Sequence, residues 1–194
     1  MIKGRTVNLR RLKIDDLPNI LKWRQDAELA RYYDELPIHM PLEIEQEIRT
    51  KISSPDRLDL VIETKKGEAI GVVFLRNIRW KDRNAELHAM VGEKDKRYIF
   101  FGAEALFLLL LYAFRRLNMH KIYGRMIEYA KEAEALMKDV GFEKEAVLRK
   151  FIYQKGRYWD FYIYRLLDRE FEEFLKSKKG KRYLTASRYE LENQ

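Results

Sequence analysis

The longest apolar run of the sequence covers residues 99–114 and is interrupted by few polar side chains. A helix that is apolar on every face has to be buried, so this run predicts a central helix packed against a sheet. The helix is expected to begin near Gly102 and Ala103 and to end near Arg115. It is the element around which the other predicted elements are arranged.

A short charged loop leads into this helix and carries Lys94, Lys96 and Arg97. The first turn of a helix presents backbone N–H groups without intrahelical partners and the positive end of the helix dipole. Cations directly before such a turn favour a site for an anion, such as a phosphate. A core helix that follows a solvated basic loop explains the same spacing, so the pattern leaves both interpretations open.

Elsewhere the apolar positions alternate with a period of two, which is typical of strands. Strands are predicted over residues 6–12, 58–63, 69–78, 84–91, 120–127, 142–153 and 158–167. Amphipathic helices are predicted over residues 15–33 (with a break), 41–53, 130–140 and 168–178. This mixture predicts a single α/β domain over residues 1–178. The polar, basic tail over residues 179–194 is expected either to be disordered or to pack on the domain or on a second copy of the chain.

Composition narrows the chemistry. The chain has 194 residues, a formal net charge of +8 and no cysteine, which excludes disulfides, thiol nucleophiles and thiolate metal sites. His39, His88 and His120 are too far apart to suggest a metal site, and none is predicted. The positive charge favours a polyanionic partner, which can be nucleic acid, a phosphorylated cofactor or an acidic surface.

No leader and no membrane span is predicted. The first residues pass directly into an alternating strand pattern rather than a signal peptide. The central apolar run is shorter than the roughly 20 residues that a spanning helix needs, and it contains Glu104. We therefore expect a cytoplasmic protein.

Several short strings support a resemblance to a known family. In chain order they are NLRRL (8–12), WRQD (23–26), NAE (84–86), GE (92–93), EAL (104–106), YAF (112–114), VGF (140–142) and GRYWD (156–160). In this order and spacing the chain resembles the GCN5-related N-acetyltransferases, and specifically their ribosomal-protein-alanine acetyltransferase-like subgroup. The resemblance covers about residues 6–167. It implies a mixed, mostly antiparallel central sheet with helices on both faces.

The resemblance also implies a site for acetyl-coenzyme A (acetyl-CoA) in a V-shaped gap between the fourth and fifth predicted strands. Met90 and Val91, which end the fourth strand, would contact the pantetheine arm through their backbone. The family holds the pyrophosphate with a loop of pattern Q/R-x-x-G-x-G/A. In this sequence Arg97 takes the first position, Phe100 the first glycine and Gly102 the second.

Three positions depart from the family's pattern. Phe100 replaces a loop glycine, and forcing it into a left-handed conformation would cost roughly 1–2 kcal/mol, about five- to thirty-fold in affinity. A ring pointing into the pyrophosphate position would block the site. Phe101 and Ala103 complete the predicted cofactor loop. Ala130 replaces an Asn that usually assists cofactor binding, and Met137 replaces a Tyr that often protonates the leaving thiolate, a loss of ~10²–10⁴ in rate.

Glu86 and His88 are the candidate catalytic residues. They are two positions apart on a predicted strand, so they share a face and can relay a proton. The alternatives are a Glu86 carboxylate paired with a nearby cation and a hydrogen-bonded, structural His88. Arg97 is predicted either to contact phosphate or to lie at the surface. Tyr129 is a weaker candidate for the missing acid.

These observations predict an N-acetyltransferase that transfers acetyl from acetyl-CoA to a primary amine. The acceptor would be a protein N-terminus, a polyamine or another small amine. The alternative is a non-catalytic descendant that uses the same cleft to bind another ligand. A weaker hypothesis, based on the charge and the tyrosines, is a module associated with RNA or the ribosome.

Overall fold

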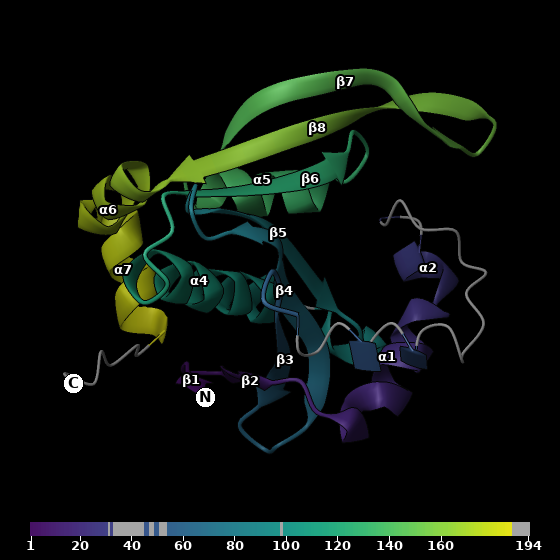
Figure 1. Ribbon diagram of the computed structural model, residues 1–194, viewed down its shortest axis with the longest axis horizontal. Coiled ribbons are helices and arrows are strands. Elements are labelled where there is room, and N and C mark those ends of the chain that lie inside the picture. Colours follow the sequence, from purple (N-terminus) through teal and green to yellow (C-terminus); the bar gives the residue numbers. More distant parts are fainter. Residues whose placement is uncertain (31, 33–44, 47–48, 51–53, 98, 188–194) are drawn as a thin grey trace.

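An eight-stranded sheet forms the centre of the molecule in a computed structural model that describes residues 1–30, 32, 45–46, 49–50, 54–97 and 99–187 (Figure 1). The strand order is β1-β2-β3-β4-β5-β6-β8-β7. The strands are β1 (Ile2–Lys3), β2 (Val7–Arg11), β3 (Leu58–Thr64), β4 (Ala69–Arg79), β5 (Asn84–Val91), β6 (Lys121–Ile127), β7 (Glu143–Gln154) and β8 (Arg157–Leu167). Of the pairs formed by described residues, β5 and β6 are parallel and the others antiparallel. The predicted mixed, mostly antiparallel sheet is confirmed.

Helices lie on both faces of this sheet. They are α1 (Leu17–Arg24), α2 (Ala27–Ala30), α4 (Ile99–Arg115), α5 (Lys131–Asp139), α6 (Asp168–Lys176) and α7 (Lys178–Ser187), with short 3-10 turns η1 (Ile14–Asp16) and η2 (Lys94–Lys96). The predicted break in the first helix is confirmed between α1 and α2. The helix predicted over residues 41–53 falls largely outside the described residues.

The helix α4 is the buried centre of the larger core, as the sequence predicts. Residues 105–111 are at most 2% exposed, and they pack against inward-facing positions of β2, β3, β4 and β5. The opposite face of the same strands carries a smaller core, in which Leu17, Ile20 and Trp23 of α1 cover Val61 and Val72. On this second face α1 therefore covers part of β3 and β4.

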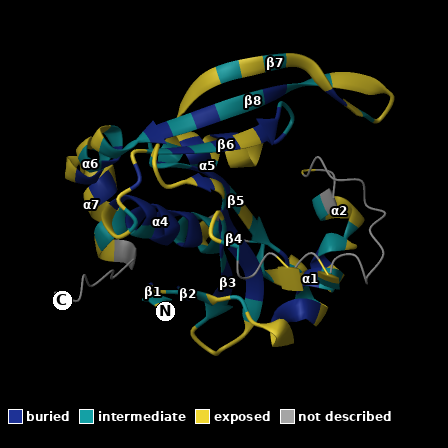
Figure 2. Ribbon diagram, in the orientation of Figure 1, coloured by how far each residue is buried: buried dark blue, intermediate teal, exposed yellow. Residues whose placement is uncertain are grey.

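The other half of the sheet is covered on one face only. Under β6 and β8, Met137 of α5 and Val140 directly after it join the main core. On the opposite face Ile127, Ile152 and Phe161 form a small cluster of their own. None of the described helices covers that cluster, and most of β7 is exposed or half-buried (Figure 2). This uncovered face borders the site described below.

The beginning of the basic tail forms α7, which packs on the domain beside α4 and α6 (Figure 1). The Tyr183 ring lies 5.1 Å from that of Phe107, and its hydroxyl donates a hydrogen bond to Asp139 at 2.6 Å. Residues 188–194 lie outside the described residues. Of the alternatives that the sequence left open, packing on the domain applies to the part of the tail that the structure describes.

Candidate active site

Two neighbouring parallel strands separate partway along their length. Strands β5 and β6 pair over residues 84–86 and 121–123, and beyond Glu86 and Tyr123 they no longer pair with each other. Residues 87–91 of β5 continue to pair with β4, and residues 124–127 of β6 continue to pair with β8. The V-shaped gap that the family resemblance implies is therefore present.

A cavity of about 760 Å³ occupies this gap and continues on to the uncovered face of the sheet. Residues from both sides of the sheet border it, which means that it passes between the strands. Met90, Val91, Arg97 and Ala130 line it, as does Met137. Four of the eight predicted cofactor positions thus border this cavity.

The remaining four predicted positions, Phe100, Phe101, Gly102 and Ala103, lie in the first turns of α4 and outside the lining formed by described residues. The helix begins at Ile99, three residues earlier than predicted. This corrects the expectation for Phe100, whose backbone is helical rather than left-handed. The cost estimated for a left-handed Phe100 does not arise.

The Phe100 side chain is 49% exposed, and its ring lies 4.1 Å from that of Phe101. It therefore does not fill the cavity between β5 and β6. The start of α4 remains close to the end of β5, because a Cβ atom built on Gly102 would lie 3.6 Å from Cγ2 of Val91. The first turn of this helix, whose N–H groups have no intrahelical partners, is thus next to the cavity wall.

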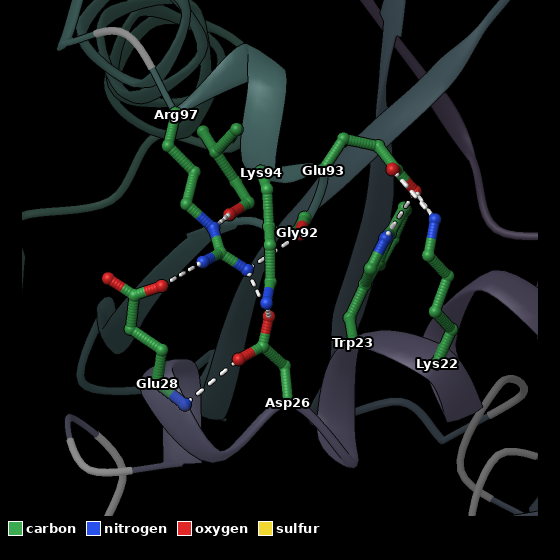
Figure 3. A network of polar contacts seen from close by, with 9 residues as sticks. Lys22, Trp23, Asp26, Glu28, Gly92, Glu93, Lys94 and Arg97 are labelled. Atoms are coloured by element: carbon green, nitrogen blue, oxygen red, sulfur yellow. Dashed lines mark hydrogen bonds and ion pairs between the residues drawn. The ribbon is translucent and has the colours of Figure 1, made fainter.

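Arg97 turns towards α1 and α2 (Figure 3). Its guanidinium donates to Asp26 at 2.6 Å, to Glu28 at 2.9 Å and to the carbonyl of Gly92 at 2.9 Å. The hydrogen bond from Arg97 holds the pKa of Asp26 below its usual value, although burial would raise it. A side chain predicted to meet phosphate or solvent instead connects the loop before α4 to the helices on the other face.

A second connection joins the same two segments. The indole of Trp23 is 1% exposed and donates to Glu93 at 2.8 Å, and Lys22 donates to the same carboxylate. A Cβ atom at Gly92 would lie 2.2 Å from the Trp23 ring, so only glycine fits there. The strings WRQD and GE, far apart in the sequence, thus form one network in the fold (Figure 3).

Glu86 and His88 are in direct contact, as their spacing predicts. The His88 Nε2 atom lies 2.9 Å from Oε1 of Glu86, and Nε of Arg125 donates to the same oxygen at 2.6 Å. Asn77 donates to the other carboxylate oxygen at 3.0 Å. Burial alone would raise the pKa of Glu86, but the hydrogen bonds from His88 and Arg125 outweigh it and lower this pKa to about 2. Glu86 is thus the paired carboxylate that the sequence left as an alternative.

The sequence did not single out Arg57, Phe74, Arg76 or Arg125, all of which border the cavity. The register of the sheet is the information that would have identified them. Arg76 pairs with Glu86 on β5, and Glu86 pairs with Tyr123 on β6. With that register, the period of two places Arg125 on the face that carries Glu86 and His88. The pairing between distant strands, which no local pattern contains, was the missing information.

Tyr129 also lines the cavity, two residues after the end of β6. Its hydroxyl donates to Gln154, and its ring packs edge-on against Trp159 at 4.9 Å. Within the described ranges, no group of three His, Asp or Glu side chains could hold a metal ion. In the same ranges, no helix has the length and apolar character needed to cross a membrane.

Comparison with known proteins identifies the family. The model of the acetyltransferase (GNAT) domain matches residues 6–143. Because this match covers more than half of the sequence, the chain belongs to the GNAT acetyltransferase family. The family predicted from the short strings is confirmed.

Named relatives show which branch of the family the chain resembles. The spermidine N(1)-acetyltransferase of Vibrio cholerae is 27% identical over 154 residues, which are 79% of this chain and 88% of that protein. The uncharacterized N-acetyltransferase p20 of Bacillus licheniformis is 25% identical over 173 residues, 85% of this chain and 94% of that protein. These relatives confirm the predicted class of activity, N-acetyl transfer. They do not point specifically to the predicted ribosomal-protein-alanine acetyltransferase-like subgroup.

Solved structures give the same result. The crystal structure of spermidine N-acetyltransferase from Vibrio cholerae in complex with CoA and spermine has a TM-score of 0.80 and 27% identity. The match covers 86% of this chain and 98% of that one. A dodecameric structure of spermidine N-acetyltransferase from the same organism has a TM-score of 0.75.

Proposed function

We propose that this chain transfers the acetyl group of acetyl-CoA to a primary amine inside the cavity between β5 and β6. The parting of these strands beyond Glu86 and Tyr123 is the observation that carries the proposal. It separates residues 87–91 of β5 from β6 and gives access to the cavity from both faces of the sheet. A long, thin thioester and a separate amine can thus meet from opposite sides.

The described residues fit the pantetheine arm and diphosphate of coenzyme A. Met90 and Val91 would meet the arm, between the apolar side chains of Leu136 and Met137. The first turn of α4, beside Val91, presents backbone N–H groups and the positive end of the helix dipole, which suit a diphosphate. Bound acetyl-CoA would supply an activated acetyl group as a thioester. Since the Arg97 donors are directed to Asp26 and Glu28, we propose that Arg97 positions this loop.

His88 is our proposed proton acceptor. An amine has to lose a proton to become nucleophilic, and histidine is the side chain that ordinarily exchanges protons near neutral pH. His88 borders the cavity, and Glu86 fixes its ring through Nε2 while Phe74 stacks on the ring at 4.9 Å. With a pKa of about 2, Glu86 stays ionised and acts through His88 as a positioning residue.

In the reaction the amine nitrogen forms a bond to the acetyl carbon, and the bond from that carbon to sulfur breaks. Met137 borders the cavity where many relatives are expected to carry a tyrosine, and its thioether cannot donate a proton. As the nitrogen becomes an amide it gives up a further proton, and this proton, passed directly or through water, converts the leaving thiolate to a thiol. Catalysis then rests mainly on holding the amine and the thioester together.

The proposed acceptor is a primary amine, and the relatives indicate which amines to consider. The Vibrio cholerae relative is named for spermidine, and its structure holds spermine. A polyamine, a protein N-terminus and another small amine are accordingly the acceptors to test first. Assembly into a homo-oligomer is part of the same proposal, because a similar structure is dodecameric.

Calorimetric titration with coenzyme A tests the proposal, using Gly102→Glu and Gly102→Ala as a matched pair. A Cβ atom at this position would make an ordinary contact with Val91 at 3.6 Å, so Gly102→Ala should not disturb the packing. A carboxylate at the helix start opposes an anion there, and we expect Gly102→Glu to weaken binding at least tenfold. Gly102→Ala should stay within about threefold of the wild type, because alanine adds no charge.

Failure of the wild-type protein to bind coenzyme A at millimolar concentration would contradict the proposal and favour a non-catalytic binding module. The RNA hypothesis predicts a different result. RNA affinity would then fall steeply with salt and would be equal in Gly102→Glu and Gly102→Ala.

A further inference from the structure

A group of cationic side chains surrounds a second hollow in the molecule, separate from the cavity between β5 and β6. This basic hollow has a volume of about 460 Å³ and is bordered by Arg5, Lys178, Lys181, Arg182 and Thr185. None of these five residues borders the cavity of the candidate active site. The proposed acetyl transfer therefore gives these cations no role.

Segments from both ends of the chain build the basic hollow. Arg5 lies between β1 and β2, and the other four residues lie on α7 (Figure 1). Along α7 these four are spaced by three, one and three positions, so they share one face of the helix. The opposite face carries Tyr183 and Leu184, which pack against the main core. This packing determines that the cationic face of α7 points away from the core.

The turn between α6 and α7 holds the cationic face in place. The hydroxyl of Ser177 accepts a hydrogen bond from the backbone N–H of Gly180 at 3.0 Å and so caps the start of α7. A Cβ atom on Gly180 would lie 2.0 Å from the carbonyl oxygen of Phe174, so the two helices approach closely here. Cations on a fixed helix lose less conformational freedom when they bind a ligand than cations on a loose tail would lose.

Neighbouring carboxylates do not neutralise the basic hollow. Within the described ranges its four cations form no ion pair. Glu104 lies beside Arg5, but it accepts hydrogen bonds from the backbone N–H groups of residues 5 and 6. Asp139 forms an ion pair with Lys179, and Arg182 adds only a weaker charge interaction to it. The side chains of residues 188–194 sum to a charge of −1, from one Arg and two Glu, so they do not balance four cations.

The lining indicates the chemistry of the ligand. Among the described residues it consists of cationic side chains and one threonine, and it contains no aromatic or large apolar side chain that could hold a base or an acyl chain. Arginine binds phosphate through two parallel hydrogen bonds, and lysine binds it as a point charge. A phosphate group carries up to two negative charges and several acceptor oxygens. A few linked phosphates thus match the charge of this hollow.

We propose that the basic hollow is a second ligand site, which binds a compact polyphosphate through Arg5 and the cationic face of α7. The inference is independent of the proposed acetyl transfer. Single-stranded nucleic acid is the less favoured polyanion, because proteins bind it with aromatic stacking platforms as well as cations. A ligand held in this way joins a segment near the start of the chain to α7, so it should stabilise the fold when it binds.

Calorimetric titration with tripolyphosphate in 50 mM salt tests the site. The test variant combines Lys181→Gln with Arg182→Gln, which removes two exposed cations without touching the core. The control combines Lys150→Gln with Lys155→Gln, which removes the same charge from the far end of the β7–β8 hairpin (Figure 1). We expect binding to be weakened at least about tenfold in the test variant and less than about twofold in the control. Equal losses in the two variants, or no binding to the wild type at millimolar tripolyphosphate, would overturn the inference.

The Arg5→Gln variant tests whether the two ends of the chain share the ligand. It should weaken binding of tripolyphosphate by about threefold or more, and it should reduce the rise in melting temperature that the ligand causes in the wild type. Wild-type affinity and a wild-type rise in melting temperature would show that α7 binds alone, and the two-segment site would be wrong.

Two further titrations separate this site from the other candidates. Gly102→Glu should bind tripolyphosphate as the wild type does, because Gly102 lies at the start of α4 and does not border the basic hollow. A loss in Gly102→Glu but not in the test variant would assign the ligand to the proposed cofactor site and overturn the inference. A twelve-nucleotide oligouridine that binds more tightly than tripolyphosphate, and loses that affinity in the test variant, would replace the compact ligand by a nucleic acid. If coenzyme A does not bind while tripolyphosphate behaves as expected, the inference holds and the proposed function fails.

Discussion

Two buried glutamates on opposite sides of the sheet have similarly lowered pKa values but different surroundings. Glu86 on β5 and Glu134 on α5 both have a pKa lowered to about 2. Glu86 contacts His88 and Arg125 in the wall of the cavity. Glu134 accepts a hydrogen bond from the fully buried Tyr164 and forms an ion pair with Lys138 at 2.9 Å.

The difference lies in what each carboxylate supports. The partners of Glu86 face a cavity that a substrate can enter, so ordering them prepares a site. The partners of Glu134 are a buried hydroxyl and solvent-facing lysines, so ordering them fastens α5 to β8. A strongly lowered pKa therefore does not by itself mark a functional group. What the partners face decides the role.

The largest expected effect is on catalysis. Glu86→Gln should lower kcat/KM for the best acceptor by about 10–100-fold, because it replaces charge-assisted hydrogen bonds that orient His88 and Arg125. Glu134→Gln removes the same charge from the other cluster and should leave kcat/KM within about twofold. Steady-state kinetics on both variants decides. Equal losses would contradict the division between the two clusters.

The next effect is on stability and concerns the other cluster. Tyr164→Phe should lower the free energy of unfolding by about 1–2 kcal/mol, since it removes a buried hydrogen bond to a charged group. The corresponding fall in melting temperature is roughly 2–8 °C for a chain of this size. The control is Tyr153→Phe, in which the altered side chain is 63% exposed. Thermal unfolding followed by circular dichroism measures both, and a Tyr164→Phe curve that overlays the control would contradict the prediction.

Acid stability should depend on both glutamates. A carboxylate whose pKa is lower in the folded state than in the unfolded chain stabilises the fold when ionised. That contribution is fully present above about pH 4.5 and is lost as the pH falls towards 2. Across this window the free energy of unfolding should fall less in Glu86→Gln and in Glu134→Gln than in the wild type. The difference should be on the order of 1 kcal/mol. Urea unfolding at pH 5, 4 and 3 measures the slope, and slopes equal to that of the wild type would contradict the prediction.

The sequence was sufficient to predict most helices and strands, because each of them is marked by a local pattern of apolar and polar positions. The alternation over residues 84–91 placed β5 with its observed ends. The beginning of α4 was misplaced because its start was read from Gly102, whereas Phe100 and Phe101 already lie within the helix. The sequence left open whether the segment that forms α7 is ordered, because Tyr183 and Leu184 appear isolated in a basic segment. Their partners, such as Phe107, lie in α4 far away in the chain.

The site was only partly accessible from the sequence, for the same reason. Met90, Val91 and Ala130, which the family resemblance assigns to the cofactor, do border the cavity, and their contact with a cofactor stays a prediction. The partners of Arg97 and the contribution of Arg125 depend on which distant segments lie side by side. Local patterns contain no such information, because the pairing is set by the register of the whole sheet.

The smallest expected effect is that of Lys138→Gln. Lys138, Lys131 and Lys144 all lie within 3.5 Å of the Glu134 carboxylate, so the loss of one leaves two. The Lys138 side chain is 58% exposed, and exposed ion pairs contribute little. The free energy of unfolding, from urea titration, should change by less than about 0.5 kcal/mol. A loss above 1 kcal/mol would mean that the lysines act as a unit. Glu86, by contrast, has Arg125 as its one arginine partner among the contacts of the described residues, and has no such reserve.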